Sequence, residues 1–402
     1  MNKIIAKNFF ATLLLLVLLF QDVIQQYIGL AKYFDEAVAL ISIIYLFLTI
    51  LTGKIQISKL KIIVFPFLLY IFFSTLGTVI YNQQNFKAVA GDFIINIKFF
   101  MTLLATSVFF SRNNLQLFET SLSKYFIYFL VIILFGLSLM DLFFDIFPSG
   151  DSFGSLNSVR IFFTHETYYV AFLVCLISIL FLYKKNSKII FLMCLLMLLF
   201  SMKIKAILFI IFAVLINFIF NKKIKIPKWI YIVCILLFSF LIAQSTIKDY
   251  INLSDSTARG ALLKYSFVNA RNNFFGTGFG SYGCYFSGVY YSKLYSVYRI
   301  DTVWGMTKTN YNYIADNFWP MILGQSGFIG LLCYFIYLIN FLFLIKKLNY
   351  SKYSFVLLFV YLCISSIAET SFNSSFSVCF AVLMGYIFNK NFIMKNDCTL
   401  NF

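Results

Sequence analysis

Apolar runs of about 20 residues, long enough to cross roughly 30 Å of hydrocarbon as an α-helix, recur from one end of this chain to the other. Of its 402 residues, 61% are hydrophobic and only 12% are charged, whereas soluble domains are about a quarter charged. A water-soluble fold cannot bury this much apolar surface, because the buried fraction levels off as domains grow. The sequence therefore predicts an all-α fold, a polytopic transmembrane helical bundle.

We expect about twelve spans in this bundle. They cover residues 8–29, 36–53, 60–81, 88–110, 123–147, 165–183, 187–202, 204–221, 227–245, 318–345, 352–368 and 373–389. The seventh and eighth are short and adjacent, so a re-entrant pair or a broken helix is an alternative there. The chain then divides into spans one to nine (1–245), one large loop (246–317), and the last three spans with a tail (318–402).

The placement of lysine and arginine sets the orientation of these spans. Nineteen of them fall on one side of the predicted map, and five fall in the short loops of the other side. Positive residues are retained in the cytoplasm, so both termini are predicted to be cytoplasmic and the loop 246–317 external. The net charge of +17 is then a topology signal, since nucleic-acid binding needs cations gathered on one folded face. We expect a multi-pass protein of the bacterial cytoplasmic membrane, with membrane lipid and no nucleic acid as a partner.

Cysteine and histidine usage gives no sign of a metal or cofactor site. The chain has no CxxC pair, and its single histidine, His165, cannot form a histidine-based zinc site. The glycines Gly276, Gly278 and Gly280 lack the G-x-G-x-x-G spacing of a dinucleotide loop. We expect no metal and no cofactor. Cys284 is the one cysteine of the long loop, and it should react with an external thiol reagent unless packing buries it.

The long loop combines cations with aromatic residues. Arg259 and Arg271 are among its basic residues, and eight of its tyrosines lie between positions 282 and 313. Guanidinium groups bind phosphate oxygens through two parallel hydrogen bonds, and tyrosine offers a sugar ring an apolar face with a hydroxyl. The loop therefore suits a glycan linked to a lipid diphosphate. An aromatic belt at the membrane interface would explain the tyrosines equally well.

Charged residues also gather where predicted spans reach the outer face. Arg160, His165 and Glu166 lie at the outer mouth of span six, and a histidine can shuttle a proton near neutrality. The alternative for His165 is an interface residue that only hydrogen-bonds a neighbour. Lys203 and Lys205 occupy the minimal turn between spans seven and eight, where they could hold a diphosphate or merely snorkel.

Several ionisable residues fall inside predicted spans, and three of them stand out. Asp92 and Lys98 lie in span four and Asp22 in span one. A charge at membrane depth is unfavourable unless it is paired. We therefore expect each of them to have a partner or a role.

Four motifs occur in a fixed order over roughly residues 155–345. They are Arg160-x-x-x-x-His-Glu; Ser201-Met-Lys203-Ile-Lys205-Ala206; Arg259-Gly-Ala-Leu-Leu followed by Asn273-Phe-Phe-Gly276-Thr-Gly278-Phe-Gly280; and Asp316-Asn317-Phe-Trp319 followed by Leu323-x-x-x-Gly327-Phe-Ile-Gly330. In order and topology they resemble the O-antigen and capsular polysaccharide polymerase (Wzy) family, which is related to the O-antigen ligases. Asp316 stands where the ligases have a histidine, which favours a polymerase. The proline usual before the glycine run is missing.

The resemblance implies metal-independent glycosyl transfer on the outer leaflet. A polyprenyl-diphosphate-linked glycan would be the donor, and a sugar hydroxyl of another lipid-linked repeat unit the acceptor. Such a reaction needs cations to neutralise the leaving diphosphate and a general base to take the hydroxyl proton. The expected substrate-binding residues are Arg259, Arg160, Lys205, Lys203, Arg271 and Trp319, and the candidate bases are Asp316, His165 and Glu166.

Other partners expected for such an enzyme are a flippase and a chain-length regulator. A ligase and a transporter of lipid-linked oligosaccharide remain as alternative functions. A transporter would not need a structured external loop of this length, and it often shows two similar halves.

Overall fold

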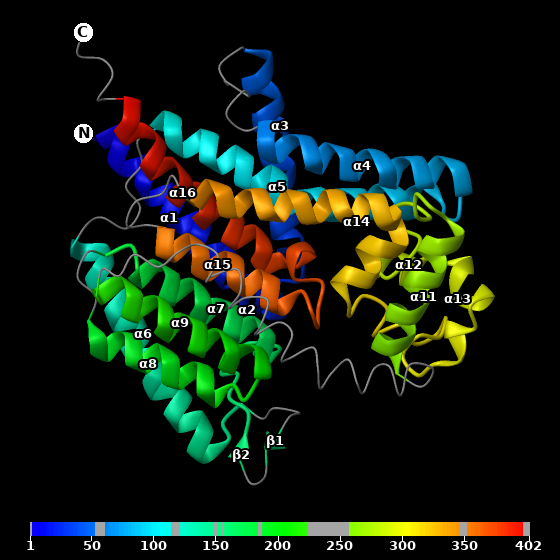
Figure 1. The fold of residues 1–402 in the computed structure, drawn as a ribbon. Coiled ribbons are helices and arrows are strands. Elements are labelled where there is room, and N and C mark those ends of the chain that lie inside the picture. Colours follow the sequence, from blue (N-terminus) through cyan, green and yellow to red (C-terminus); the bar gives the residue numbers. More distant parts are fainter. Residues whose placement is uncertain are drawn as a thin grey trace.

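The computed structural model describes residues 2–52, 61–113, 121–147, 152–153, 156–183, 187–222, 257–345 and 352–396 (Figure 1). The helices are α1 (Asn2–Leu19), α2 (Gln21–Tyr27), α3 (Phe34–Leu51), α4 (Lys61–Tyr81), α5 (Phe86–Asn113), α6 (Ser121–Phe144), α7 (Glu166–Leu180), α8 (Lys188–Phe200), α9 (Ile204–Lys222), α11 (Ala258–Asn272), α12 (Tyr285–Val289), α13 (Lys293–Val297), α14 (Phe318–Ile345), α15 (Lys352–Ser365) and α16 (Ser375–Asn396). The described residues also form three 3₁₀ helices, η1 (Gly29–Tyr33), η3 (Ile300–Thr302) and η4 (Ser371–Asn373). The strands described are β1 (Ser152–Phe153) and β2 (Leu156–Asn157), an antiparallel pair.

Five helical segments within the described ranges are long and apolar enough to cross a membrane. These are Gly29–Leu51, Ile62–Tyr81, Phe86–Asn113, Ser123–Phe144 and Phe318–Phe341. Five shorter apolar helices, of 10–17 residues, accompany them. Large apolar side chains such as Phe47, Phe65 and Phe129 are exposed on these helices, as expected for surfaces that face lipid. The all-helical architecture is confirmed, and the apolar helices indicate a membrane protein. The count of twelve spans stays a prediction, and its ninth segment, 227–245, lies outside the described residues.

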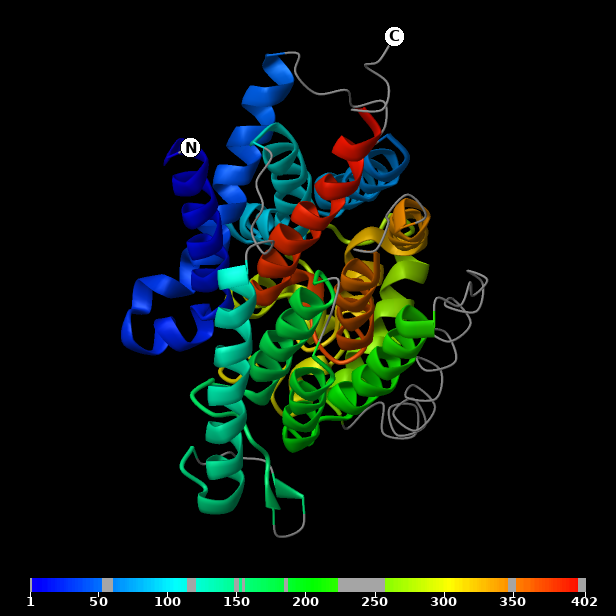
Figure 2. The ribbon, with the colours of Figure 1, turned by 90° about the vertical axis from the view of Figure 1, so that its left-hand side faces the viewer.

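The helices pack in two groups. In the first, α5 packs against α16 and α3, and α4 lies along α14. The second contains α6, α7, α8 and α9, coloured teal to green in Figure 2, and α15 packs on α7 and α9. Helix α7 is buried on almost every side, as expected for a helix that is apolar all round. The start of α1 and the end of α16 both lie away from the end formed by α11–α13 (Figure 1).

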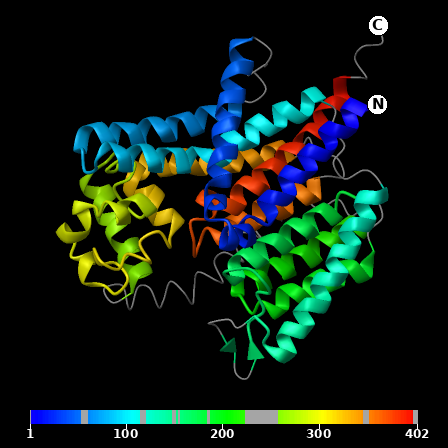
Figure 3. The same cartoon turned by 180° about the vertical axis from the view of Figure 1, so that it is seen from behind.

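Residues 258–317, which we call the cap, fold as a small unit with a core of their own. The cap covers one end of α4, α5 and α14 (Figure 3). Its core consists of Ala261, Leu262, Tyr282, Leu294, Tyr295, Ile300, Val303, Met306 and Ile314. Two of the tyrosines considered for sugar binding, Tyr282 and Tyr295, are therefore core residues, whereas Tyr285 and Tyr290 are exposed. Residues 246–256 of the predicted loop lie outside the described part of the chain.

Candidate functional site

Arg259 and Asp316 meet where the cap joins the membrane helices. Arg259 lies in the first turn of α11, and the Thr257 hydroxyl caps this helix by accepting from the amide of Gly260. Asp316 directly precedes Asn317 and the start of α14. The Arg259 Nη2 and Asp316 Oδ2 atoms are 3.3 Å apart, and the two side chains are 37% and 29% exposed. The pair is therefore partly open to solvent.

A second ion pair joins α9 to the turn after α15. Lys205 Nζ lies 2.7 Å from Glu369 Oε1 and also donates to the Thr167 hydroxyl at 2.6 Å. The side chains of Lys205 and Glu369 are 16% and 24% exposed. The sequence does not predict Glu369 as a site residue. It is one acidic residue in a short turn without a motif, so only its neighbours in space reveal it.

A third group surrounds Glu166 at the start of α7. Its Oε2 atom is 3.6 Å from Lys203 Nζ and 3.5 Å from His165 Nδ1, and its Oε1 atom accepts from the Ser158 hydroxyl at 3.0 Å. The Glu166 side chain is only 5% exposed. His165 is the N-cap of α7, where Nδ1 accepts from the amide of Thr167 at 3.1 Å. His165 thus has the hydrogen-bonding role considered as its alternative, and only its Nε2 is left for proton exchange.

The three groups lie close enough for their charges to interact. Arg259 and Lys203 both act on the ammonium group of Lys205, and Glu369 and His165 both act on the Asp316 carboxyl. We call the whole set the junction cluster: Arg259, Asp316, Lys205, Glu369, Lys203, Glu166 and His165.

Asp316 has a perturbed pKa within this cluster. Burial raises the pKa of the Asp316 carboxyl above its usual range, and the neighbouring Arg259 guanidinium opposes that rise. The negative charge of Glu369 adds to the rise. A carboxylate with a raised pKa accepts a proton more readily, which suits a general base.

The remaining predicted residues lie at different distances from the cluster. Trp319 Nε1 donates to the hydroxyl of Ser366 at 3.1 Å. Ser366 lies three residues before Glu369, so Trp319 borders the cluster. Arg160 donates through Nη1 to the carbonyl of Thr164, just before His165. Arg271 is exposed near the far end of α11. That places it about 18 Å along the helix axis from Arg259, outside the cluster.

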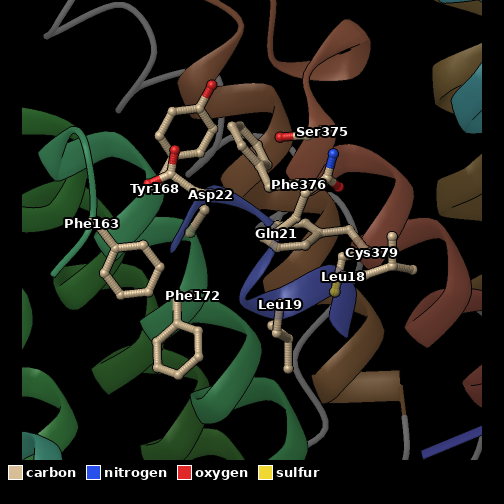
Figure 4. Close-up of a pocket in the computed structure, with 12 residues that line it drawn as sticks. Leu18, Leu19, Gln21, Asp22, Phe163, Tyr168, Phe172, Ser375, Phe376 and Cys379 are labelled. Atoms are coloured by element: carbon tan, nitrogen blue, oxygen red, sulfur yellow. The ribbon is translucent and has the colours of Figure 1, made fainter. Parts of the chain in front are cut away.

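A small pocket lies beside the cluster, between the end of α1 and the starts of α2, α7 and α16. Figure 4 shows its polar residues Gln21, Asp22, Tyr168 and Ser375 among leucine and phenylalanine side chains. Both carboxylate oxygens of Asp22 accept from Thr164, one from its amide at 2.8 Å and one from its hydroxyl at 2.5 Å. Asp22 therefore holds the segment that delivers His165 and Glu166 to the cluster.

Lys98 has the partner that its depth requires. Its Nζ atom is 2.6 Å from Asp35 Oδ2, and the two side chains are 3% and 2% exposed. Gln21 Nε2 donates to the other oxygen of Asp35 at 2.8 Å. This buried group joins α2, α3 and α5 and exposes almost nothing to a substrate.

Metal binding has no candidate site in the described ranges, where no three His, Cys, Asp or Glu residues are grouped to hold an ion. Comparison with known proteins identifies no family: no family model, no curated protein and no solved structure matches the chain.

Proposed function

We propose that the protein is a membrane glycosyltransferase that polymerises polyprenyl-diphosphate-linked repeat units into O-antigen or capsular polysaccharide. The observation that carries this proposal is the junction cluster. It gathers three cations and three carboxylates where a folded cap meets apolar helices. Motifs that lie far apart in the sequence converge there, and these are the motifs that resemble the Wzy family.

The cluster suits a lipid diphosphate because its cations can change partners. Arg259, Lys205 and Lys203 each pair with a carboxylate, and each of the three cations is partly exposed. A diphosphate that reaches them would replace those carboxylates and take up the charge that develops on the leaving group. When Arg259 turns to phosphate, it releases Asp316. Donor binding would thus free the base that the reaction needs.

The proposed reaction balances without a cofactor. The acceptor hydroxyl oxygen forms a bond to the anomeric carbon of the donor sugar, while the bond from that carbon to the diphosphate breaks. The electron pair leaves with the polyprenyl diphosphate, and the hydroxyl proton passes to Asp316. Asp316 is the preferred base because it has one ion-pair partner among the described residues and is partly exposed, whereas Glu166 is nearly buried and engaged by Ser158 and Lys203.

The proposal includes the topology predicted from the lysines and arginines. Both termini would be cytoplasmic and the cap external, with about twelve spans in the membrane. Cys284 is buried, so it cannot report on this topology. Ser296, exposed in α13, offers a better probe: Ser296→Cys should react with a membrane-impermeant thiol reagent in cells whose outer envelope has been opened. Reaction only after lysis would place the cap inside.

The proposed activity is tested by deleting the gene and analysing surface glycan on gels. A polymerase predicts loss of long chains with survival of a single-repeat band, and the wild-type gene should restore the long chains. Loss of all surface-attached glycan, with lipid-linked polymer still present, would indicate a ligase instead.

Complementation with Arg259 variants then tests the cluster. At equal protein level, Arg259→Ala should leave only single repeats. Arg259→Lys should not restore long chains, because lysine cannot form bidentate hydrogen bonds to a phosphate. Arg271→Ala is the matched control, since it removes an exposed arginine from the other end of the same helix. Normal chain length with Arg259→Ala would remove Arg259 from the site.

A further inference from the structure

The glycine-rich turn Gly276–Gly280 is held by three helices. Four consecutive backbone amides of the turn donate hydrogen bonds to these helices. Two bind backbone carbonyls of α14: Thr277 N donates to Gly324 O at 3.0 Å, and Gly278 N donates to Gln325 O at 2.9 Å. The other two bind side chains: Phe279 N donates to Thr78 Oγ1 of α4 at 3.0 Å, and Gly280 N donates to Asp92 Oδ2 of α5 at 2.7 Å. A phosphate-binding loop keeps such amides for its ligand. Here they are already used, so the turn is a joint between the cap and the bundle.

The glycines are required by this close approach. Gly278 has a φ of 86°, and a Cβ atom added there would lie 2.3 Å from Thr78. Gly276 has a φ of 70°, and its Cβ would lie 2.4 Å from Gln325. On the other side of the joint, α14 loses helical geometry at Gly327, with φ 65° and ψ −171°. This break leaves the carbonyls of Gly324 and Gln325 free to accept from the turn, as irregular backbone inside a membrane protein requires.

The joint also connects the two elements that carry the proposed site. Asn269 of α11 is fully buried, and its Nδ2 donates to Thr277 Oγ1 at 3.0 Å and to Gly324 O at 2.9 Å. Arg259 lies in the first turn of α11, and Asp316 lies just before the start of α14. A shift of the turn would therefore move both residues of the Arg259–Asp316 pair.

Asp92 is the charged member of this joint. Its side chain lies between the helices with 1% exposure. Its Oδ2 atom accepts from Gly280, and its Oδ1 atom has no hydrogen-bond partner among the described residues. Its role in the joint accounts for an acidic residue at a depth where charge is unfavourable.

We propose that Asp92 is a positioning residue: it holds the glycine-rich turn against α5 and so sets where the cap places Arg259 and Asp316. The part of this inference that concerns catalysis rests on the proposed function. The part that concerns the joint does not.

Cys284 reports on the joint without any assay of activity. It follows the turn, is 3% exposed and lies close to Asp92. In detergent-purified protein, we expect a maleimide to label Cys284 slowly, with the labelled peptide identified by mass spectrometry. Loss of a buried hydrogen-bonding partner should increase opening of the cap, and hence labelling, roughly tenfold.

Four variants separate a hydrogen-bonding role from a merely structural one. Asp92→Leu removes the acceptor for Gly280, and Asp92→Asn retains an oxygen there, so only the leucine variant should label faster. Thr78→Val removes the second side-chain acceptor with little change of shape, which keeps the test valid if Asp92→Leu does not fold. Gly278→Ala should also label faster. Its matched control is Gly136→Ala in α6, where a Cβ meets nothing within 4 Å.

The same proteins are then given lipid-linked repeat units. Thr78→Val and Asp92→Leu should polymerise at least about tenfold more slowly, whereas Asp92→Asn should retain the wild-type rate. If Asp92→Leu and Thr78→Val label and polymerise like the wild type, the proposal is overturned. If even the wild type makes no polymer, the proposed function fails while the labelling of Cys284 still decides whether Asp92 holds the joint.

Discussion

Two groups of ion pairs in this protein differ in what surrounds them. In the junction cluster, the side chains of Arg259, Asp316, Lys205 and Glu369 are 16–37% exposed. The Lys98–Asp35 pair between α5 and α3 is 2–3% exposed. A partly exposed pair separates at little cost, because water or a phosphate can replace either partner. A buried pair cannot separate without stranding a charge in a medium of low polarity.

This difference in exposure suggests a structural role for the buried pair and a substrate-binding role for the junction cluster. The buried pair, with Gln21 as its third member, fixes the relative positions of helices. The exposed pairs can exchange their partners for a substrate. Charge within the spans is thus structural here, and charge at the rim is the candidate for chemistry.

The largest expected effect comes from Asp316→Asn in the exposed group. Asparagine has nearly the same shape but cannot accept a proton at neutral pH. If Asp316 is the general base, the rate of polymer formation should fall by roughly 10²–10⁴-fold. The measurement is polymer made from lipid-linked repeat units at equal protein level.

Two observations accompany this test. The melting temperature of Asp316→Asn in detergent should stay close to that of the wild type, because a pair that is partly open to solvent contributes little to stability. A variant that polymerises at the wild-type rate would move the base elsewhere in the cluster, with His165, Glu166 or Glu369 as the next residues to test.

The buried group should respond in the opposite way, in stability before activity. Lys98→Met leaves Asp35 without its cation and should destabilise the folded protein by about 3–5 kcal/mol. The double variant Lys98→Met with Asp35→Asn should recover most of that loss, since neither charge remains. Thermal unfolding of the purified proteins measures both.

A matched control for this prediction lies on the same helix. Lys87 is exposed near the start of α5, so Lys87→Met should leave the melting temperature nearly unchanged. Equal stability of Lys98→Met and Lys87→Met would show that burial of the pair is not what distinguishes the two groups.

The helices of this fold could be predicted from the sequence more easily than the ion pairs between them. In lipid, the backbone must satisfy its hydrogen bonds within each segment, so apolar runs alone locate helices such as α4, α5 and α14. Lys98 is expected to need a partner, because an unpaired charge at membrane depth is unfavourable. Nothing in its local sequence indicates Asp35, because that partner is set by the packing of α3 against α5.

The candidate site shows the same limit. The sequence placed Arg259 and Asp316 at opposite ends of one loop, and only the fold of the cap brings them within 3.3 Å. Glu369 was missed because its turn contains no motif. Arg271 shares a helix with Arg259, but the length of α11 keeps it out of the cluster.

The smallest effect we predict is a shift in the pH dependence of kcat/KM for the donor, which reports the enzyme before donor binds and so compares Asp316 with and without its cation. A general base works only when deprotonated, so the rate should fall on acidification through the pKa of Asp316. Burial raises that pKa, which places the acid limb above the value of about 3.9 for a free aspartate. Arg259 opposes the rise, so Arg259→Gln should move the acid limb to still higher pH.

Two controls keep this shift specific to Asp316. The donor diphosphate is esterified at both ends and keeps its charge over this pH range. Rates normalised to each protein's own maximum isolate the shift from any loss of donor binding, and Arg271→Gln should leave the limb where it is. An acid limb that stays in place or moves to lower pH in Arg259→Gln would show that Arg259 does not control the base.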